Sequence, residues 1–194
     1  MINAGTWVVE PEVLQRIPPD TKISFERELF PQILADDLPF YAYPTDNYWM
    51  DTGTPENYLQ LHRDLLSGKY DGYKPEEDVT TGKGCKIHAS VKFRGKVIIG
   101  DNCVIASGVK LTGPVVLGPN CKIGEDTTIT DSVVWHDTAI SKGVTIKSSI
   151  LADNCKIGDG CSLTDAVLGD HVTISDSITL KKGSRIMPGE IVKE

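Results

Sequence analysis

The sequence predicts a mostly β protein. A parallel β-solenoid over residues 81–194 follows a small partial α/β segment over residues 1–73 and a linker over residues 74–80. Two observations predict the solenoid: an aliphatic residue returns every five or six positions, and the shorter steps recur regularly, after Ile129, Ile146 and Leu163. This two-level period is typical of three short strands per coil, which gives about six coils here. The aliphatic positions are Ile99, Ile105, Leu111, Leu117, Ile123, Ile129, Val134, Ile140, Ile146, Leu151, Ile157, Leu163, Leu168, Ile174 and Leu180.

The residues between these positions predict the corners of each coil. Three residues after most aliphatic positions stands a residue type that accepts positive φ. The predicted corner residues are Asn102, Gly108, Asn120, Asp126, Asp137, Gly143, Asn154, Gly160, His171 and Gly183. The residue after each corner is small or β-branched, and we expect it to point inward. These predicted inward residues are Cys103, Val109, Cys121, Thr127, Thr138, Val144, Cys155, Cys161 and Val172.

Four of the five cysteines fall in one inward column. Cys85, Cys103 and Cys121 are evenly spaced by one coil, and Cys155 follows two coils later. No C-x-x-C pair of the kind that binds zinc occurs in the sequence. Stacked coils lie about 4.8 Å apart, which leaves a disulfide within reach. Free thiols acting as small core residues are the preferred interpretation, and reduced cysteines favour a cytoplasmic location.

Composition argues against two classes of partner. The 194 residues carry a net charge of −7 and no basic patch, so a nucleic-acid backbone is not an expected ligand. No apolar run reaches the roughly 18 residues of a membrane span, and no secretory signal pattern opens the sequence. We therefore expect a cytoplasmic protein that binds neither nucleic acid nor membrane.

Predicted strands and helices alternate over residues 1–73. Strands are expected over residues 3–9, 40–43 and 48–51. Helices are expected to begin near Glu10 and Ser24, and Pro31 should kink or split the second. A third helix has Thr54 as its N-cap and Gly68 at its end. A piece of this size lies at the lower limit for an independent core, so it is interpreted as part of a larger domain.

Three motifs in this segment carry a family resemblance. The motifs are INAGTWV at residues 2–8, SFERELFP at residues 24–31 and YWMDTGTP at residues 48–55. Their order and spacing resemble the second half of a sugar-nucleotide pyrophosphorylase (nucleotidyltransferase) domain. The set is most similar to mannose-1-phosphate guanylyltransferases that carry a C-terminal hexapeptide-repeat left-handed β-helix. Glucose-1-phosphate nucleotidyltransferases are a close second.

The resemblance implies site residues and a cofactor. Such enzymes join a sugar 1-phosphate to an NTP and release pyrophosphate, with Mg²⁺ bridging the phosphates. Asp51 matches one of the two family aspartates that hold the metal, and Asn3 and Glu26 match residues that lie near the sugar. The alternatives are local roles: Asp51 could cap the following turn, Asn3 could be a turn residue, and Glu26 could be a solvated first-turn carboxylate.

The sequence departs from the family in one respect. The Gly-rich nucleotide loop, the first metal-binding aspartate and the lysine that meets the sugar phosphate have no counterpart in these residues. The chain is therefore expected to be a fragment or split part that is inactive alone. The resemblance implies sugar 1-phosphate and NTP as ligands of the complete enzyme, and a homo-oligomer formed through the β-helix.

Two other functions stay open. Many hexapeptide β-helix proteins are CoA-dependent acyltransferases that use a histidine base, for which His136 and His88 are the weak candidates. His171 fills a corner position. No long loop interrupts residues 99–180, which argues against acyl transfer. The third possibility is a purely structural assembly or regulatory module.

Overall fold

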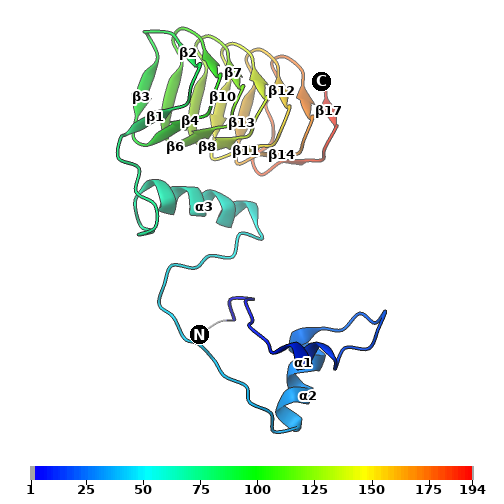
Figure 1. The fold of residues 1–194 in the computed structure, drawn as a ribbon. Coiled ribbons are helices and arrows are strands. Elements are labelled where there is room, and N and C mark those ends of the chain that lie inside the picture. The colour runs from blue at the N-terminus through cyan, green and yellow to red at the C-terminus, as the bar shows by residue number, and fades with distance from the viewer. Residues whose placement is uncertain (1–2, 194) are drawn as a thin grey trace. The chain divides into compact units, whose positions relative to one another are not determined.

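The computed structural model describes residues 3–193, which form two compact units: Met1–Trp49 and Met50–Glu194. Figure 1 shows both units. Residues 1, 2 and 194 of the predicted segments lie outside the described part of the chain.

The first unit is built on short helices around an aromatic cluster. They are α1 (Pro11–Leu14), the wide π-helical turn η1 (Phe25–Leu29) and α2 (Phe30–Ala35). Ser24 caps η1, since its Oγ accepts a hydrogen bond from the Arg27 N–H at 3.2 Å. Pro31 stands in the first turn of α2, directly after the wide turn of η1. The backbone stays helical through Leu29 and Phe30, so the helix changes type before Pro31 and is not split.

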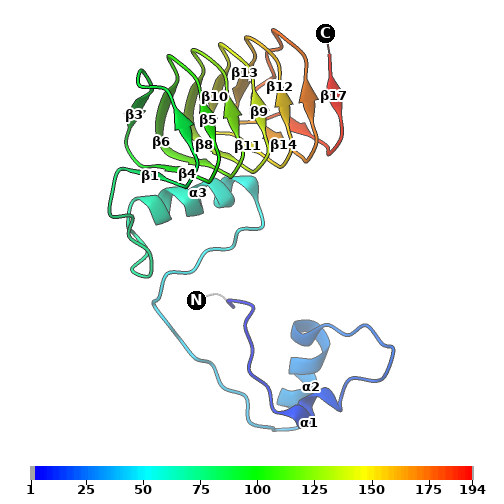
Figure 2. The same ribbon diagram turned by 45° about the horizontal axis from the view of Figure 1, so that its top comes forward.

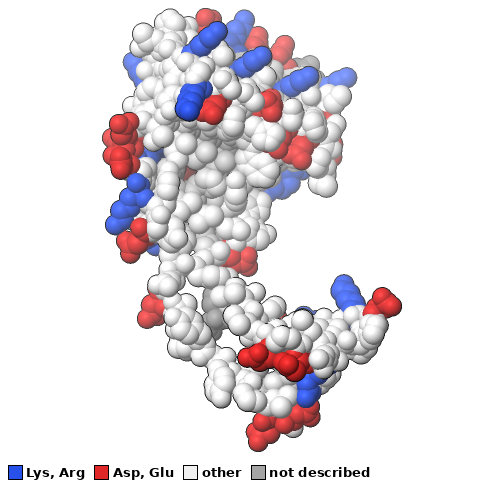
Figure 3. All heavy atoms as spheres, in the orientation of Figure 1, with Lys and Arg blue, Asp and Glu red and all other residues white. Residues whose placement is uncertain are grey.

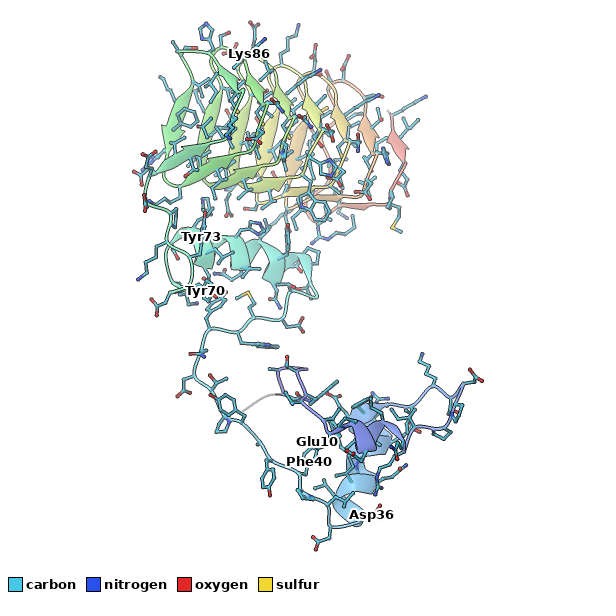
Figure 4. The ribbon with its side chains drawn as sticks, viewed as in Figure 1. Glu10, Asp36, Phe40, Tyr70, Tyr73 and Lys86 are labelled. Atoms are coloured by element: carbon cyan, nitrogen blue, oxygen red, sulfur yellow. The ribbon has the colours of Figure 1, made fainter. Side chains whose placement is uncertain are left out.

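The rings of the first unit pack against one another in an apolar core. Trp7 stacks on Phe25 at 5.5 Å between ring centroids, and Phe30 lies 5.0 Å from Phe40. Phe40 is labelled in Figure 4. Leu29 and Ile33 are buried in the same unit. This small core is made by residues far apart in the sequence.

The strands predicted over residues 3–9, 40–43 and 48–51 are not formed. These segments contain no strand, and Val8, Tyr41 and Tyr43 are 100%, 88% and 92% exposed. A strand needs a hydrogen-bonded neighbour, and the described residues of the first unit supply none. The pattern of apolar and β-branched residues is strand-like, but the prediction of formed strands is wrong.

The second unit begins with a capped helix and continues as a parallel β-solenoid. Helix α3 (Pro55–Leu66) has Thr54 as its N-cap, because the Thr54 Oγ1 accepts a hydrogen bond from the Asn57 N–H at 3.2 Å. Gly68 follows the helix with φ of +75°, as predicted for its end. Within residues 3–193 no helix is long and apolar enough to cross a bilayer.

The solenoid has three faces of parallel strands, stacked as Figures 1 and 2 show. The first face contains β1 (Val79–Thr81), β4 (Val97–Ile99), the second halves of β6 (Lys110–Leu117) and β8 (Thr128–Val134), β11 (Ile150–Leu151), β14 (Val167–Leu168) and β16 (Arg185–Ile186). The second contains β2 (Lys86–Ile87), β5 (Val104–Ile105), β7 (Lys122–Ile123), β9 (Ala139–Ile140), β12 (Lys156–Ile157), β15 (Thr173–Ile174) and β17 (Ile191–Val192). The third contains β3 (Lys92–Arg94), the first halves of β6 and β8, β10 (Thr145–Lys147) and β13 (Ser162–Thr164). The predicted solenoid of about six coils is confirmed.

The pairing register explains the mixed spacing of the sequence. Val97 pairs with Val115, whereas Ile150 pairs with Val167, so the later coil is one residue shorter. The change occurs between β6 and β8, where the register shifts after Thr112. All the aliphatic positions named above are buried and form one core cluster.

The corners adopt the predicted conformation. Every predicted corner residue has positive φ, including His171 at +60°. A third set of corners is absent from the predicted pattern: Asp131, Ser148 and Asp165 have φ of +49°, +48° and +54°. They stand two residues after an aliphatic position instead of three, because these edges of the coil are one residue shorter.

Side chains of the inward column that contains Cys103, Cys121 and Thr138 donate hydrogen bonds to backbone carbonyls at one corner of the coil. Cys103 Sγ donates a hydrogen bond to the Gly118 carbonyl at 3.2 Å, and Cys121 Sγ donates to the Trp135 carbonyl at 3.0 Å. Thr138 stands in the same column and donates to the Ala152 carbonyl at 3.0 Å. Each donor therefore pairs with a carbonyl of the next coil. All five cysteines are free thiols, as preferred from the sequence.

Helix α3 packs on the first face of the solenoid. Leu59 clusters with the outward side chains of Val133 and Ile150, and Val116 and Val167 flank them. This apolar stripe repeats once per coil, yet the sequence pattern identified only the inward positions. The first face is therefore covered on its outer side, and Figure 2 shows α3 lying along it.

An ion pair holds the last turns of α3 to a solenoid corner. Arg63 donates two hydrogen bonds to the Asp131 carboxylate, from Nε at 2.8 Å and Nη2 at 2.7 Å. Burial alone would raise the pKa of Asp131, but hydrogen bonds from Arg63 and Ser148 outweigh it and hold that pKa below its ordinary value of 3.8. A bidentate pair of this kind also fixes orientation.

We expect burial of a solenoid thiol to make stability fall at high pH. Burial raises the pKa of Cys155 to about 11 from the ordinary 9.0, so folding favours the neutral thiol. The stabilisation is complete below pH 9 and is lost as pH rises towards 11, at a cost of roughly 1–3 kcal/mol. Urea unfolding across this pH range measures the loss, with Cys155→Ala as the control. An equal loss in the variant would contradict the expectation.

Replacing Arg63 with Ala is expected to lower the free energy of unfolding of the second unit by about 1 kcal/mol at pH 7. Because the folded pKa of Asp131 is depressed, the contribution is present above pH 3.8 and disappears as the pH falls through the folded value. Denaturant unfolding at pH 7 and at low pH measures both effects. Arg94→Ala, an exposed change on β3, is the matched control and should leave stability unchanged. A loss that is the same at both pH values would refute the assignment.

Candidate functional site

The first unit brings two predicted sugar-binding residues together. Asn3 Nδ2 donates a hydrogen bond to Glu26 Oε1 at 2.7 Å, although the two residues belong to different motifs. Asn3 Oδ1 also accepts a hydrogen bond from the Gly5 N–H at 2.8 Å, and Gly5 has φ of +71°. Both side chains are exposed. The pair offers an amide and a carboxylate side by side, which are groups that hydrogen-bond sugar hydroxyls.

The surroundings of this pair are acidic. Residues 1–49 contain eight Asp and Glu against three Lys and Arg. Figure 3 shows acidic side chains on the visible face of this unit. Glu28 is used locally, because its Oε1 accepts a hydrogen bond from the Ser24 N–H at 3.0 Å. The unit therefore has little positive charge with which to hold a phosphate.

Asp51 lies at the start of the second unit and caps a turn. Its Oδ1 accepts a hydrogen bond from the Gly53 N–H at 2.8 Å. A Cβ on Gly53 would lie 3.0 Å from that same oxygen, so the tight turn favours glycine. This is the local role considered from the sequence. It leaves the Asp51 side chain exposed at the edge of the unit.

The described residues do not complete a magnesium site. No group of three or more His, Cys, Asp and Glu side chains that could hold a metal ion lies together in residues 3–193. Mg²⁺ needs several oxygen ligands in an octahedral arrangement, and Asp51 offers a single carboxylate. The residues described here therefore do not fit a complete Mg²⁺ centre by themselves.

The solenoid fixes the helix that follows the Asp51 turn. The indole Nε1 of Trp135 donates a hydrogen bond to the Tyr58 hydroxyl at 3.1 Å, and Arg185 pairs with Glu56 at 2.7 Å. A shallow hollow of about 420 Å³ lies between this end of α3 and the solenoid. Its walls include Thr52, Gly53, Trp135, Gly169 and Asp170.

Trp135 and Arg185 are residues whose role the sequence pattern did not reveal. Trp135 stands out as a large residue between Gly and Ala in a column that ends at Met187, but nothing in the pattern names its partner. Arg185 follows the apolar column of Val116, Val133 and Val167 in the final coil. A change of residue type within a structural column was the available signal.

The candidate histidines have local partners. His136 lies between two carboxylates, with Nδ1 at 2.7 Å from Asp137 Oδ2 and Nε2 at 2.8 Å from Asp153 Oδ2. His88 Nδ1 lies 2.8 Å from Ser90 Oγ. A general base needs a ring nitrogen that can accept a proton from substrate. In this arrangement both nitrogens of His136 are occupied by carboxylates of the corner.

Two family models match the chain. The model described as the GMPPB C-terminal domain matches residues 93–194, and the model described as nucleotidyl transferase matches residues 1–68. The first covers more than half of the 194 residues. Together they match both parts of the resemblance drawn from the motifs.

Curated relatives align with part of the chain. A mannose-1-phosphate guanylyltransferase of Mycobacterium tuberculosis is 47% identical over 68 residues, which are 34% of this chain and 19% of that protein. A UTP–glucose-1-phosphate uridylyltransferase of Synechocystis is 39% identical over 66 residues, 34% of this chain and 17% of that protein. The mannose-1-phosphate guanylyltransferase catalytic subunit beta of Dictyostelium discoideum is 36% identical over 86 residues, 43% and 22% of the two chains. The chain thus spans about a fifth of the length of these relatives.

A solved structure shares the solenoid fold. A mutant form of AntD, an N-acyltransferase from Bacillus cereus, superposes with a TM-score of 0.55. The sequence identity is 16%, over 58% of this chain and 77% of that one. At this identity the likeness concerns the fold alone. The matched family model decides the assignment: the chain belongs to the family of the GMPPB C-terminal domain, and its first 68 residues match the nucleotidyl transferase family.

Proposed function

We propose that this chain is part of a sugar-1-phosphate nucleotidyltransferase, with mannose 1-phosphate and GTP as the favoured substrates. The chain supplies part of the sugar site and a β-solenoid. The observation that carries the proposal is the Asn3–Glu26 hydrogen bond of 2.7 Å, which joins two distant motifs of the nucleotidyl transferase segment. The printed names of the relatives from M. tuberculosis and D. discoideum favour the mannose and guanine forms.

The proposed chemistry is transfer of a nucleotidyl group to the sugar phosphate. The sugar phosphate oxygen attacks the α-phosphorus of the NTP, a new P–O bond forms, and pyrophosphate leaves. The residues of this chain contribute by binding: Asn3 can donate to one sugar hydroxyl and accept from another, and Glu26 can accept. Positioning of this kind accounts for much of the rate of such reactions.

The same proposal holds that the chain is inactive alone. Its residues include no Gly-rich loop to hold a triphosphate. The single carboxylate of Asp51 does not make a metal centre, so the nucleotide and its Mg²⁺ need groups from outside these residues. A partner chain or a further segment would have to supply them.

We also propose that the solenoid is the oligomerising element. The coils at its two ends are less well buried than the middle ones: Val79, Ile87 and Phe93 at one end, and Ile186 and Val192 at the other, are partly exposed. Strands at an open end carry unpaired backbone groups, which favour association with another copy. Acyl transfer is not favoured by any specific contact, since His136 is held between Asp137 and Asp153.

The isolated chain is expected to form no GDP-mannose from GTP, mannose 1-phosphate and Mg²⁺. The physical reason is the missing triphosphate cradle, without which the α-phosphorus is not held in line. Chromatographic detection of GDP-mannose measures the reaction, and the relative from M. tuberculosis, assayed in parallel, shows that the assay works. Product above the enzyme-free blank would overturn the proposed inactivity.

Mannose 1-phosphate is nevertheless expected to bind weakly to the first unit. Titration of mannose 1-phosphate into the ¹⁵N-labelled chain should shift the NMR signals of the Asn3 side-chain amide and the Gly5 backbone amide. Both report on the site, because the Asn3 amide donates to Glu26 and its oxygen accepts from the Gly5 N–H. Asn3→Ala should weaken binding at least about tenfold, because it removes a donor and an acceptor together.

Asn47→Ala is the control for this titration, since Asn47 is an asparagine elsewhere in the same unit and its backbone N–H bonds Thr45 Oγ1. It should bind like the parent. If the Gly5 backbone amide shifted equally in the Asn3→Ala variant and in the parent, the sugar would bind elsewhere.

A further inference from the structure

Trp135 interrupts a corner column of small residues. Its neighbours in successive coils are Gly100, Gly118, Ala152 and Gly169, and Met187 follows in the final coil. A Cβ on Gly118 would lie 2.7 Å from the His136 backbone nitrogen, so the column is tight against the next coil. A large side chain at this position must project outward. Trp135 does so and remains 39% exposed.

The projecting indole reaches the first turns of α3. Its Nε1–H donates to the Tyr58 hydroxyl at 3.1 Å, and the two rings are 6.3 Å apart between centroids. Tyr58 also packs against the apolar stripe of the first face, which includes Ile150. Trp135 therefore supplies a directional contact, whereas the apolar stripe alone would let the helix slide.

Arg185 makes the second directional contact from the last coil. Its Nη2 donates to Glu56 Oε1 at 2.7 Å, and its Nη1 donates to the Asp165 carbonyl at 2.7 Å. The guanidinium thus bridges a solenoid corner and the second residue of α3. Arg185 stands at the end of the column in which Val133, Ile150 and Val167 are apolar and cluster with residues of α3.

Helix α3 carries these contacts to the turn that precedes it. Asp51 lies shortly before Glu56 in the sequence, and short-range hydrogen bonds hold both the Asp51 turn and the first turn of α3. Asp51 Oδ1 accepts from the Gly53 N–H at 2.8 Å, and Thr54 Oγ1 accepts from the Asn57 N–H at 3.2 Å. Gly53 also lines the hollow that contains Trp135. Fixing the first turn of α3 therefore limits where the adjoining Asp51 turn can lie.

We propose that Trp135 and Arg185 are positioning residues for the loop of residues 51–54, so that the solenoid sets where the Asp51 carboxylate lies. The role of Asp51 in catalysis rests on the proposed function, but the positioning itself does not. The solenoid then contributes to the nucleotidyltransferase site through α3, in addition to any role in assembly. Supporting groups of this kind hold a site's side chains in a productive geometry.

The test is hydrogen exchange on the complete chain, without nucleotide or sugar. The amides of Gly53 and Asn57 report the loop and the helix start. Trp135→Phe keeps an aromatic ring but removes the N–H donor, and Arg185→Gln removes the cationic bridge. Each variant should raise exchange at both amides about three- to tenfold. Arg185→Lys keeps the charge and should restore part of the protection.

Two controls separate positioning from general stability. Lys156→Ala changes an exposed residue on the second face and should leave both amides unchanged. Core amides bonded between coils, such as the Val104 N–H to the Cys121 carbonyl, should exchange as in the parent in every variant. Rates at Gly53 and Asn57 within twofold of the parent would overturn the proposal. An equal rise at the core amides would overturn it too, by showing a merely structural role. Failure of the sugar titration above would leave this result untouched.

Discussion

The closure of each coil in register with its neighbours is the constraint on which the second unit depends. Each coil must turn three corners while its strands stay paired with the coil before and after. Residues at the corners adopt positive φ, and small inward residues such as Cys121 and Thr138 donate hydrogen bonds to carbonyls of the next coil. The inward hydrogen bond recurs in successive coils from Cys85 to Cys155. Because the coils repeat in this way, the core is a continuous column of aliphatic side chains, and the outward positions are free to vary.

That freedom is used on the first face. Outward valines and an isoleucine form an apolar stripe that α3 covers, and polar contacts at both ends set the position of the helix along it. Arg63 pairs with Asp131, which is the corner residue of the edge that is one residue shorter in the later coils. The shortening therefore also places the Asp131 carboxylate within reach of Arg63. The solenoid therefore provides the surface on which α3, which is not part of the repeat, is positioned. Asp51 lies just before this helix in the sequence.

The proposed functional residues form incomplete sets. Asn3 and Glu26 meet in the first unit, and Asp51 stands at the start of the second, with a single carboxylate. The exposed apolar residues Val8, Tyr41 and Tyr43 belong to segments with strand-like sequence, and the described residues of the first unit contain no strand for them to pair with. Segments without a pairing strand and a half-filled site both support the proposal that further polypeptide completes the enzyme. On that proposal, different sets of residues contribute the binding of sugar and the binding of nucleotide.

The amino-acid pattern was enough to predict the solenoid, its coil length, two of its three sets of corners and the inward cysteine column. It could do so because a repeat places equivalent residues in equivalent positions, so local pattern and tertiary contact coincide. It also identified Asn3, Glu26 and Asp51, though only through resemblance. The tertiary structure alone decided that Asn3 bonds Glu26, that Trp135 bonds Tyr58, and that residues 3–9 and 40–43 form no strands. Those outcomes depend on contacts between residues far apart in the chain, and no period records such contacts.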